Sequence, residues 1–382
     1  CSNNCPYKVR RFNFYTIPEQ IAANYGRAAG TSASVIVLLL TIPASYVLML
    51  GVLVQLFTGW SIEASCAAGA VISFAFLLSG GFRADVLTNT VQFVLMYLGF
   101  GVMAYFLLTA LGSPSDMLAR LPDAHKTLTG NYSWQYIVSW FVISLQTFVD
   151  PSFHQRCAAA KSPNVARRGV FISVACWIIF DLLTLSAGLY ARAYFEIENP
   201  VMAFPVLAEG ILPVAAKGLF VTALLSVVMS TLTSYFFISG ATIGNDLLPT
   251  RLAERFGRIV PLRIGLVIAG VLAILLALAI PSAIDLIYKT SSIAVPGLLV
   301  PLMFTFTRHY KLRKGSATAI MIASSGIALV WTLLRMIGEG WEYPLGAVVD
   351  AFEPMVPGIA IAFVLGLAFA ERSDKIVVSE TE

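Results

Sequence analysis

The segment Gly218–Ile243 has the sequence GLFVTALLSVVMSTLTSYFFISGATI, which is long and apolar enough to form a buried or membrane helix. Within it, Met229–Ser234 carries four hydroxyl side chains. Residues three and four positions apart share one face of a helix, so several of these hydroxyls lie together. Because a helix in lipid satisfies its own backbone, the cluster indicates a hard-cation site or a polar pathway. The alternative is that small side chains allow a tight contact between helices.

The whole chain has the composition of a polytopic membrane protein. Hydrophobic residues make up 58% and charged residues 12%, with a mean hydropathy of +0.81. Apolar runs of about 20 residues, the length that crosses a bilayer, recur along the sequence. We therefore predict an all-α fold with a single transmembrane domain over residues 31–371. Its ten predicted spans are 31–57, 63–80, 85–111, 134–152, 169–193, 215–244, 262–281, 284–307, 316–337 and 345–371.

Lysine and arginine predict the orientation of these spans. Alternate connections, beginning with residues 1–30 and ending with 372–382, contain 19 of the 25 basic residues. Positively charged loops face the cytoplasm, so we expect both ends of this chain to be cytoplasmic. The predicted location is the cytoplasmic (inner) membrane, with the lipid bilayer as partner. This bias accounts for the net charge of +4, which does not indicate a nucleic-acid partner.

Residues 1–30 are expected to form a cytoplasmic loop and residues 372–382 a cytoplasmic tail. In the loop, Thr16-Ile17-Pro18-Glu19 has the pattern of a helix start, with a hydroxyl N-cap and an early proline. We predict a short amphipathic helix there. The chain begins without methionine or a signal segment, as expected for an N-terminally truncated sequence.

Four motifs follow one another along the chain. They are Thr16-Ile-Pro-Glu-Gln with Asn24-Tyr-Gly, Gly80-Gly-Phe-Arg-Ala-Asp-Val-Leu-Thr-Asn-Thr-Val-Gln92, His154-Gln-Arg156 with Ala158-Ala-Ala-Lys-Ser162, and Val228-Met-Ser-Thr231 with Asn245-Asp246. In these motifs, their order and their spacing the chain resembles the sodium/solute symporter family. That family includes the proline, pantothenate, sialic acid and sugar symporters.

The resemblance implies a LeuT-type transporter fold, in which two inverted repeats hold the substrate and sodium sites between them. Residues 31–111 would be the remainder of repeat one, residues 134–307 the whole of repeat two, and residues 316–371 peripheral helices. Relative to the family, about three N-terminal helices are expected to be missing, including the broken first helix of repeat one.

The resemblance also gives the hydroxyl cluster a role. In the family, two adjacent hydroxyls of this helix bind a sodium ion, together with a backbone carbonyl one turn earlier. Those positions match Ser230, Thr231 and Val227. Sodium is a hard cation that takes oxygen ligands, so we expect it as the coupling ion. In the family, the remaining carbonyls come from the broken first helix.

Some family members have a second sodium site, which uses further hydroxyls of this helix and an aspartate. The hydroxyls match Thr233 and Ser234, but Asn89 stands where the family has the aspartate. Asp85, one turn earlier, either replaces it or is a solvated residue at a helix start. Because an amide carries no charge to offset the ion, we predict one sodium ion per cycle.

Substrate-binding candidates lie first in the predicted span 134–152. Its inward polar residues are Gln146, Thr147 and Asp150. An ionisable group near membrane depth must be paired or hydrated. Asp150 therefore either meets a positively charged substrate group or is a helix-end residue close to Arg156.

Two further candidates come from other spans. Tyr288 opens the span 284–307, where the family places substrate contacts. Asp181 is the deepest acidic residue of the chain and has either a proton or substrate role or a structural hydrogen bond.

The predicted function is sodium-coupled symport of a small organic solute by alternating access. The histidines and cysteines lack metal-ligand spacing and no nucleotide loop or nucleophile motif occurs, so we expect neither an enzyme nor an organic cofactor. One rival is a transporter-like sensory domain, which the short segment after the last span disfavours because it has no kinase region. The other is a truncated fragment that does not transport. The sequence predicts no particular oligomeric state.

Overall fold

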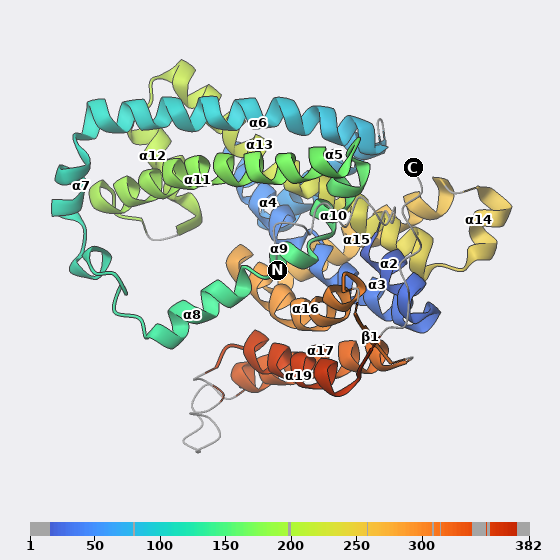
Figure 1. The fold of residues 1–382 in the computed structure, drawn as a ribbon. Helices are drawn as coiled ribbons and strands as arrows, with labels where there is room; N and C mark the ends of the chain where they lie inside the picture. The colour runs from blue at the N-terminus through green and yellow to red at the C-terminus, as the bar shows by residue number, and fades with distance from the viewer. Residues whose placement is uncertain are drawn as a thin grey trace.

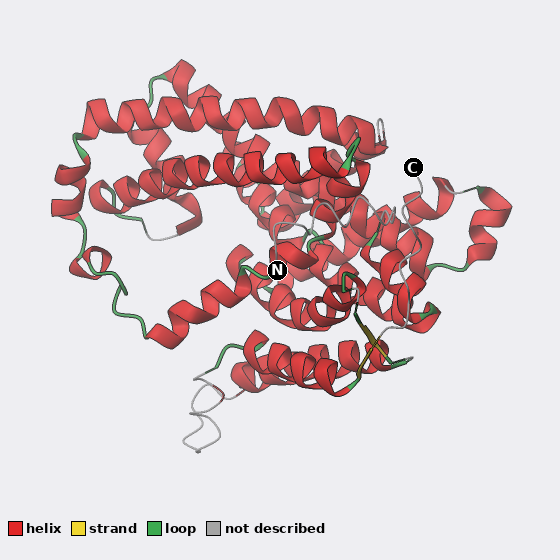
Figure 2. Ribbon diagram, in the orientation of Figure 1, coloured by secondary structure: helices red, strands yellow, loops and turns green. Residues whose placement is uncertain are grey.

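The structure is a computed structural model that describes residues 16–78, 81–197, 200–257, 259–307, 309–313, 315–337, 349 and 352–372. These residues are almost entirely helical, as Figure 1 and Figure 2 show. A small antiparallel ladder pairs β1 (Tyr310–Leu312) with β2 (Ala370–Arg372). The prediction of an all-α fold is confirmed.

The first part of the chain forms short helices followed by one long helix. The elements are α2 (Ile17–Tyr25), α3 (Arg27–Thr41), α4 (Ala44–Thr58), α5 (Ile62–Leu78), α6 (Gly81–Phe106), the π-helical turn η1 (Leu107–Leu111), α7 (Pro114–Arg120) and the 3₁₀ turn η2 (Asp123–Lys126).

Helix α2 is the short helix that the sequence predicts before the first span. The Thr16 hydroxyl accepts a hydrogen bond from the Glu19 backbone nitrogen at 3.1 Å, and Pro18 lies in the first turn. This is the hydroxyl N-cap expected from the sequence. Gly26, with φ of 93°, ends α2, so α3 begins within residues 1–30, which were predicted to be a loop.

The predicted span 31–57 is divided into α3 and α4. Pro43 has no backbone N–H to donate, and the residue before a proline is pushed out of the helical region. Ile42 accordingly has φ −55° and ψ 117°, and α4 begins only at Ala44. The backbone is therefore non-helical at residues 42–43, in the middle of a segment apolar enough to cross a membrane.

The second part of the chain contains most of the long helices. The elements are α8 (Trp134–Ile143), α9 (Gln146–Val149), α10 (Pro151–Ala159), α11 (Pro163–Tyr194), the 3₁₀ turn η3 (Pro200–Met202), α12 (Ala203–Ile211), α13 (Val214–Ala241), the π-helical turn η4 (Thr242–Leu247), α14 (Thr250–Phe256), α15 (Ile259–Ala279), α16 (Ala283–Thr305), α17 (Ser316–Ile337) and α19 (Met355–Ala368).

Seven helical segments in the described residues are long and apolar enough to cross a membrane. The other three predicted spans correspond to the shorter α5, the interrupted pair α8 and α9, and α19. Helix α19 has 14 residues, about 21 Å of helix, which is less than the roughly 30 Å of a bilayer core. Ten spans thus stay a prediction.

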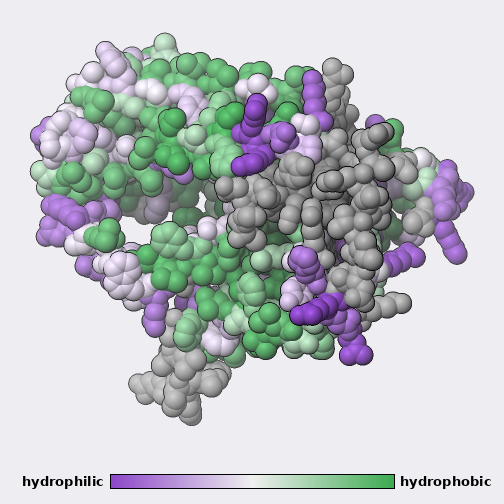
Figure 3. Space-filling model, in the orientation of Figure 1, coloured by the Kyte–Doolittle hydropathy of each residue, from purple (hydrophilic) through white to green (hydrophobic). Residues whose placement is uncertain are grey.

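The helices pack as layers around α13. In Figure 1, α6 and α11 run alongside each other, with α13 behind α6, and α17 pairs with α19. Hydrophobic residues predominate over the α6 and α11 layer in Figure 3, and hydrophilic residues gather around α7 and α14. Leu87 on α6 and Leu185 on α11 are 62% and 64% exposed, as expected of helices that face lipid.

Candidate ion and substrate sites

The predicted sodium ligands lie in the middle of α13. The Ser230 hydroxyl donates to the Val227 carbonyl at 3.0 Å, so two of the three predicted ligand oxygens are adjacent. Ser230 and Thr231 are both half-buried. The helix therefore places one predicted hydroxyl beside a carbonyl oxygen and carries a second hydroxyl on the next residue, and groups of this kind suit a hard cation.

The residues predicted for a second sodium site lie one turn further along α13. Thr233 donates back to the Met229 carbonyl at 2.9 Å. The Ser234 hydroxyl lies 3.5 Å from the Asn89 amide nitrogen of α6 and 3.1 Å from an Arg156 guanidinium nitrogen of α10, and both nitrogens donate to it. The structure thus brings Asn89 and Ser234 together and places the positively charged Arg156 side chain beside them.

Asp150 lies at the junction between α9 and α10, where it is the N-cap of α10. One carboxylate oxygen accepts from the backbone nitrogens of Ser152 and Phe153 at 2.8 and 3.2 Å, and from the Ser152 hydroxyl at 2.6 Å. The other oxygen accepts from the Tyr235 phenol of α13 at 2.6 Å. Both oxygens are engaged and the residue is 6% exposed, so its position is that of a structural anchor.

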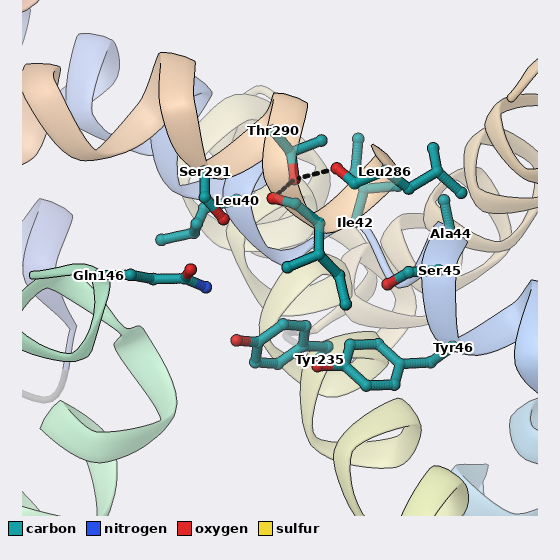
Figure 4. Close-up of a pocket in the computed structure, with 11 residues that line it drawn as sticks. Leu40, Ile42, Ala44, Ser45, Tyr46, Gln146, Tyr235, Leu286, Thr290 and Ser291 are labelled. Atoms are coloured by element: carbon teal, nitrogen blue, oxygen red, sulfur yellow. Dashed lines mark hydrogen bonds between the residues drawn. The ribbon is translucent and has the colours of Figure 1, made fainter. Parts of the chain in front are cut away.

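A small cavity lies between the break in α3 and α4, the start of α9, and α13 and α16 (Figure 4). Gln146, Tyr235 and Ser291 point into it from three elements. Its volume of about 20 Å³ has room for about one water molecule. The lining residues are Leu40, Ile42, Ala44, Ser45, Tyr46, Gln146, Tyr235, Leu286, Ile287, Thr290 and Ser291.

Helix α16, whose Ser291 lines this cavity, carries polar groups that the helix itself does not satisfy. Ser291 and Ser292 are 1% and 0% exposed, and neither hydroxyl has a hydrogen-bond partner among the described residues. Pro296 lies inside the same helix and lacks an N–H, so the Ser292 carbonyl loses its helical donor. Buried polar groups of this kind favour a polar ligand or water.

A larger cavity of about 760 Å³ lies between α6, α10 and α11. Asn89 and Arg156 both line it, together with mostly apolar side chains and Ser173. The polar group around Ser234 therefore borders this cavity.

The remaining predicted substrate residues do not line the small cavity. Thr147 is exposed on α9, and Asp181 is exposed on α11. Tyr288 packs its ring against Trp140, with 6.0 Å between centroids, and its hydroxyl is buried without a hydrogen-bond partner among the described residues. The structure therefore brings together Gln146 and Asp150 with α13, but not Thr147, Asp181 or Tyr288.

The two aromatic residues of the cavity were not predicted from the sequence. Tyr46 and Tyr235 meet edge to face, with 5.6 Å between ring centroids and an interplanar angle of 87°. The available signal was the position of Tyr235, one helical turn after Thr231 and hence on the same face of α13. The position of Tyr46 three residues after the helix-breaking Pro43 gave a weaker signal.

Apolar helices that enclose interrupted helices, buried hydroxyls and a buried carboxylate define a membrane transporter of the secondary type. The chain belongs to the sodium:solute symporter family, whose family model matches residues 6–323. It is a sodium-coupled solute symporter in the lipid bilayer, and not an enzyme, as the sequence predicted.

Named relatives agree with this assignment. The sodium/pantothenate symporter of Escherichia coli (strain K12) is 25% identical over 98% of this chain and 79% of the relative. The sodium/proline symporter of Haemophilus influenzae is 27% identical over 61% of this chain and 51% of the relative.

Solved structures share the fold. A Na⁺-coupled sialic acid symporter in its outward-open state matches with a TM-score of 0.73 and 16% identity, over 96% of this chain and 80% of the other. A nucleobase-cation-symport-1 family transporter matches with a TM-score of 0.54 and 14% identity, over 96% and 82%. The LeuT-type fold expected from the sequence is therefore confirmed.

Proposed function

We propose that the protein takes up a small organic acid or amino acid across the cytoplasmic (inner) membrane with one sodium ion per cycle, both ends of this chain being cytoplasmic. The observation that carries this proposal is the position of Tyr235, which lines the small cavity and lies one turn from Thr231 on α13. Ion and solute would thus act on one helix. Relatives named for pantothenate and proline support the solute class.

The proposed sodium ligands are the Ser230 and Thr231 hydroxyls and the Val227 carbonyl. In the structure, the Ser230 hydroxyl donates to that carbonyl. A bound cation would turn the hydroxyl so that its lone pairs, and those of the carbonyl, face the ion. A rotation of one hydroxyl is a small rearrangement, which suits an ion that must bind and leave in every cycle.

A second sodium ion is disfavoured by charge. The Arg156 guanidinium donates to Ser234, the hydroxyl that a second ion would use, and Asn89 adds no negative charge. A cation a few ångströms from another costs about 4 kcal/mol at an effective dielectric constant of 20. We therefore propose that Thr233 and Ser234 form hydrogen bonds within and between helices and do not bind an ion.

The proposed solute site is the cavity of Figure 4, with Gln146 as the contact residue predicted from the sequence and Ser291 beside it. A cavity of about 20 Å³ is too small for an organic acid, so α9 or α16 must move when the solute binds. Asp150 would hold α10 rather than contact the solute. Thr147, Asp181 and Tyr288 are not assigned to this site.

The test is uptake into proteoliposomes that contain the purified protein. Radiolabelled pantothenate and proline are offered with an inward sodium gradient and, as the control, with an equal potassium gradient. We expect uptake of at least one of the two solutes that depends on sodium and is abolished by dissipating the gradient. Equal uptake in sodium and potassium would contradict sodium coupling.

The sodium ligands are tested in the same vesicles by Ser230→Ala and Thr231→Ala. Loss of an oxygen that contacts a charge removes about 1.5–3 kcal/mol, so the sodium concentration for half-maximal uptake should rise about tenfold to a hundredfold. Thr222→Ala is the matched control, because Thr222 is an exposed hydroxyl of α13 that donates only to the Gly218 carbonyl in the described contacts. An unchanged sodium dependence in both ligand variants would refute the assignment.

A further inference from the structure

Helix α10 is fastened to α13 at two points. Its N-cap, Asp150, accepts a hydrogen bond from the Tyr235 phenol at 2.6 Å. Nearly two turns later, Arg156 donates to the Ser234 hydroxyl at 3.1 Å. Both partners on α13 are consecutive residues, so the two bonds attach the whole of α10 to one position on the sodium helix.

The same position lies one turn from the proposed sodium ligands. Ser234 follows Ser230 by four residues, and Tyr235 follows Thr231 by four, so each pair shares a face of α13. The Ser234 hydroxyl also donates to the Ser230 carbonyl at 3.0 Å. A rotation or shift of α13 around a bound ion would therefore move both attachment points of α10.

The backbone is non-helical at the junction before α10. Asp150 has φ −68° and ψ 117°, which is an extended conformation between two helices. Gln146 of α9, on the other side of this junction, faces the cavity whose wall Tyr235 forms. Tyr235 thus contacts both this non-helical junction and the proposed solute cavity.

We propose that Tyr235 is a positioning residue that transmits sodium binding on α13 to α10 through its hydrogen bond with Asp150, an inference that rests on the proposed sodium site. The ring supplies packing, since it meets Tyr46 edge to face. The hydroxyl supplies the link to α10. Removal of the hydroxyl alone separates these two roles.

The reporter for α10 is its own Cys157. Cys157 is 8% exposed and packs in one cluster with its neighbour Ala158 and with Ala166 of α11. Burial raises the pKa of the Cys157 thiol, so it reacts slowly while α10 is docked. The parent variant has the other four cysteines, Cys1, Cys5, Cys66 and Cys176, replaced by alanine.

The experiment measures the rate at which N-ethylmaleimide alkylates Cys157 in the full chain, in sodium and in potassium, together with radioactive sodium binding. In the parent we expect the two rates to differ about fivefold or more, the lower end of ordinary coupling between sites. In Tyr235→Phe the rate in potassium should rise and the difference should fall below about twofold, while sodium still binds.

Two further variants make the result specific. Asp150→Asn keeps an N-cap acceptor but weakens a charge-assisted bond, so its rate difference should lie between those of the parent and Tyr235→Phe. Tyr190→Phe is the matched control, because it removes a phenol that donates to the Gly112 carbonyl at 2.8 Å, away from α13, and should behave like the parent.

The outcomes separate this inference from the proposed function. If the parent binds no sodium, the proposed sodium site fails and the inference fails with it. If the parent binds sodium but Cys157 reacts equally in both salts, or if Tyr235→Phe keeps the parent's rate difference, the inference alone is overturned.

Discussion

Single residues create the polar positions inside this apolar bundle. Pro43 interrupts the first long apolar segment, and Pro296 removes a donor from α16. One carboxylate oxygen of Asp150 accepts three hydrogen bonds from Ser152 and Phe153 at the start of α10. Each of these residues leaves or orients polar groups where the chain would otherwise be a closed, lipid-compatible helix.

The sequence predicted residue roles where the signal is local. The Thr16 cap was predictable because its partner is three residues away. The contacts of Asp150 with Tyr235 and of Arg156 with Ser234 join residues 85 and 78 positions apart, so no periodicity reports them. For Asp150, the sequence left two roles open, and the geometry favours the helix-end role.

His154 gives a pH-dependent prediction. It is buried in α10 after the predicted span, and this burial lowers its pKa below the ordinary value of 6.5, although the Phe148 carbonyl at 3.1 Å opposes the shift. The folded protein therefore holds the neutral ring, and its contribution to stability is present above about pH 6.5. As pH falls below that value, stability should drop by up to about 1.4 kcal/mol per unit from this residue.

The measurement is the thermal midpoint of the detergent-solubilised protein from pH 7.5 down to pH 5. We expect His154→Gln to lose less stability over this range than the wild type does. His125→Gln, which changes an exposed histidine in η2, should follow the wild type. Parallel curves for His154→Gln and the wild type would show that this residue does not titrate on unfolding.

At the scale of elements, the sequence located long uniform helices better than interrupted ones. The spans at α11, α13 and α15 were predicted to within six residues at each end because apolar composition sets them directly. The split between α8 and α9, by contrast, contains neither proline nor glycine. The sequence therefore carries no local helix breaker at this position, and hydropathy alone cannot report the split.

Close helix contacts give the element-scale prediction. Helices α6 and α13 meet at Gly99, where a β-carbon would overlap the Ala223 side chain and crowd the Leu219 carbonyl. Gly101, two residues along α6, has open space around it. We expect Gly99→Ala to destabilise the protein by about 1–3 kcal/mol through overpacking. Gly101→Ala should be neutral or stabilising by up to about 1 kcal/mol.

Thermal unfolding of the two glycine variants in the same detergent measures this difference. The pair shares one helix and one chemical change, so helix propensity is common to both and only the contact with α13 differs. Equal midpoints would mean that α6 and α13 separate enough to admit a methyl group.

At the scale of the whole molecule, composition was sufficient for a polytopic all-α membrane protein, whereas the LeuT-type fold was predicted from the family resemblance of the four motifs. Apolar segments long enough to cross a membrane and motifs in family order lead to a sodium-coupled transporter, and the family match over residues 6–323 agrees. The solute cannot be deduced in the same way. The small cavity of about 20 Å³ is shaped by side chains from four separated segments, and recognition depends on how they move.

The coupling ratio, the number of sodium ions carried with each solute, is a property of the whole molecule that depends on single residues. For a solute without net charge, a tenfold sodium gradient supplies about 1.4 kcal/mol and 100 mV about 2.3 kcal/mol for each ion. One ion therefore limits accumulation to about 500-fold, and two ions to more than about 10⁵-fold. Because Arg156 and the neutral Asn89 both donate to the Ser234 hydroxyl, the candidate ligand of a second ion, we expect the lower limit.

Initial fluxes of radioactive sodium and proline, or whichever solute is carried, into voltage-clamped proteoliposomes should be equal. Two sodium ions per solute would show that Ser234 releases Arg156 and binds an ion after all.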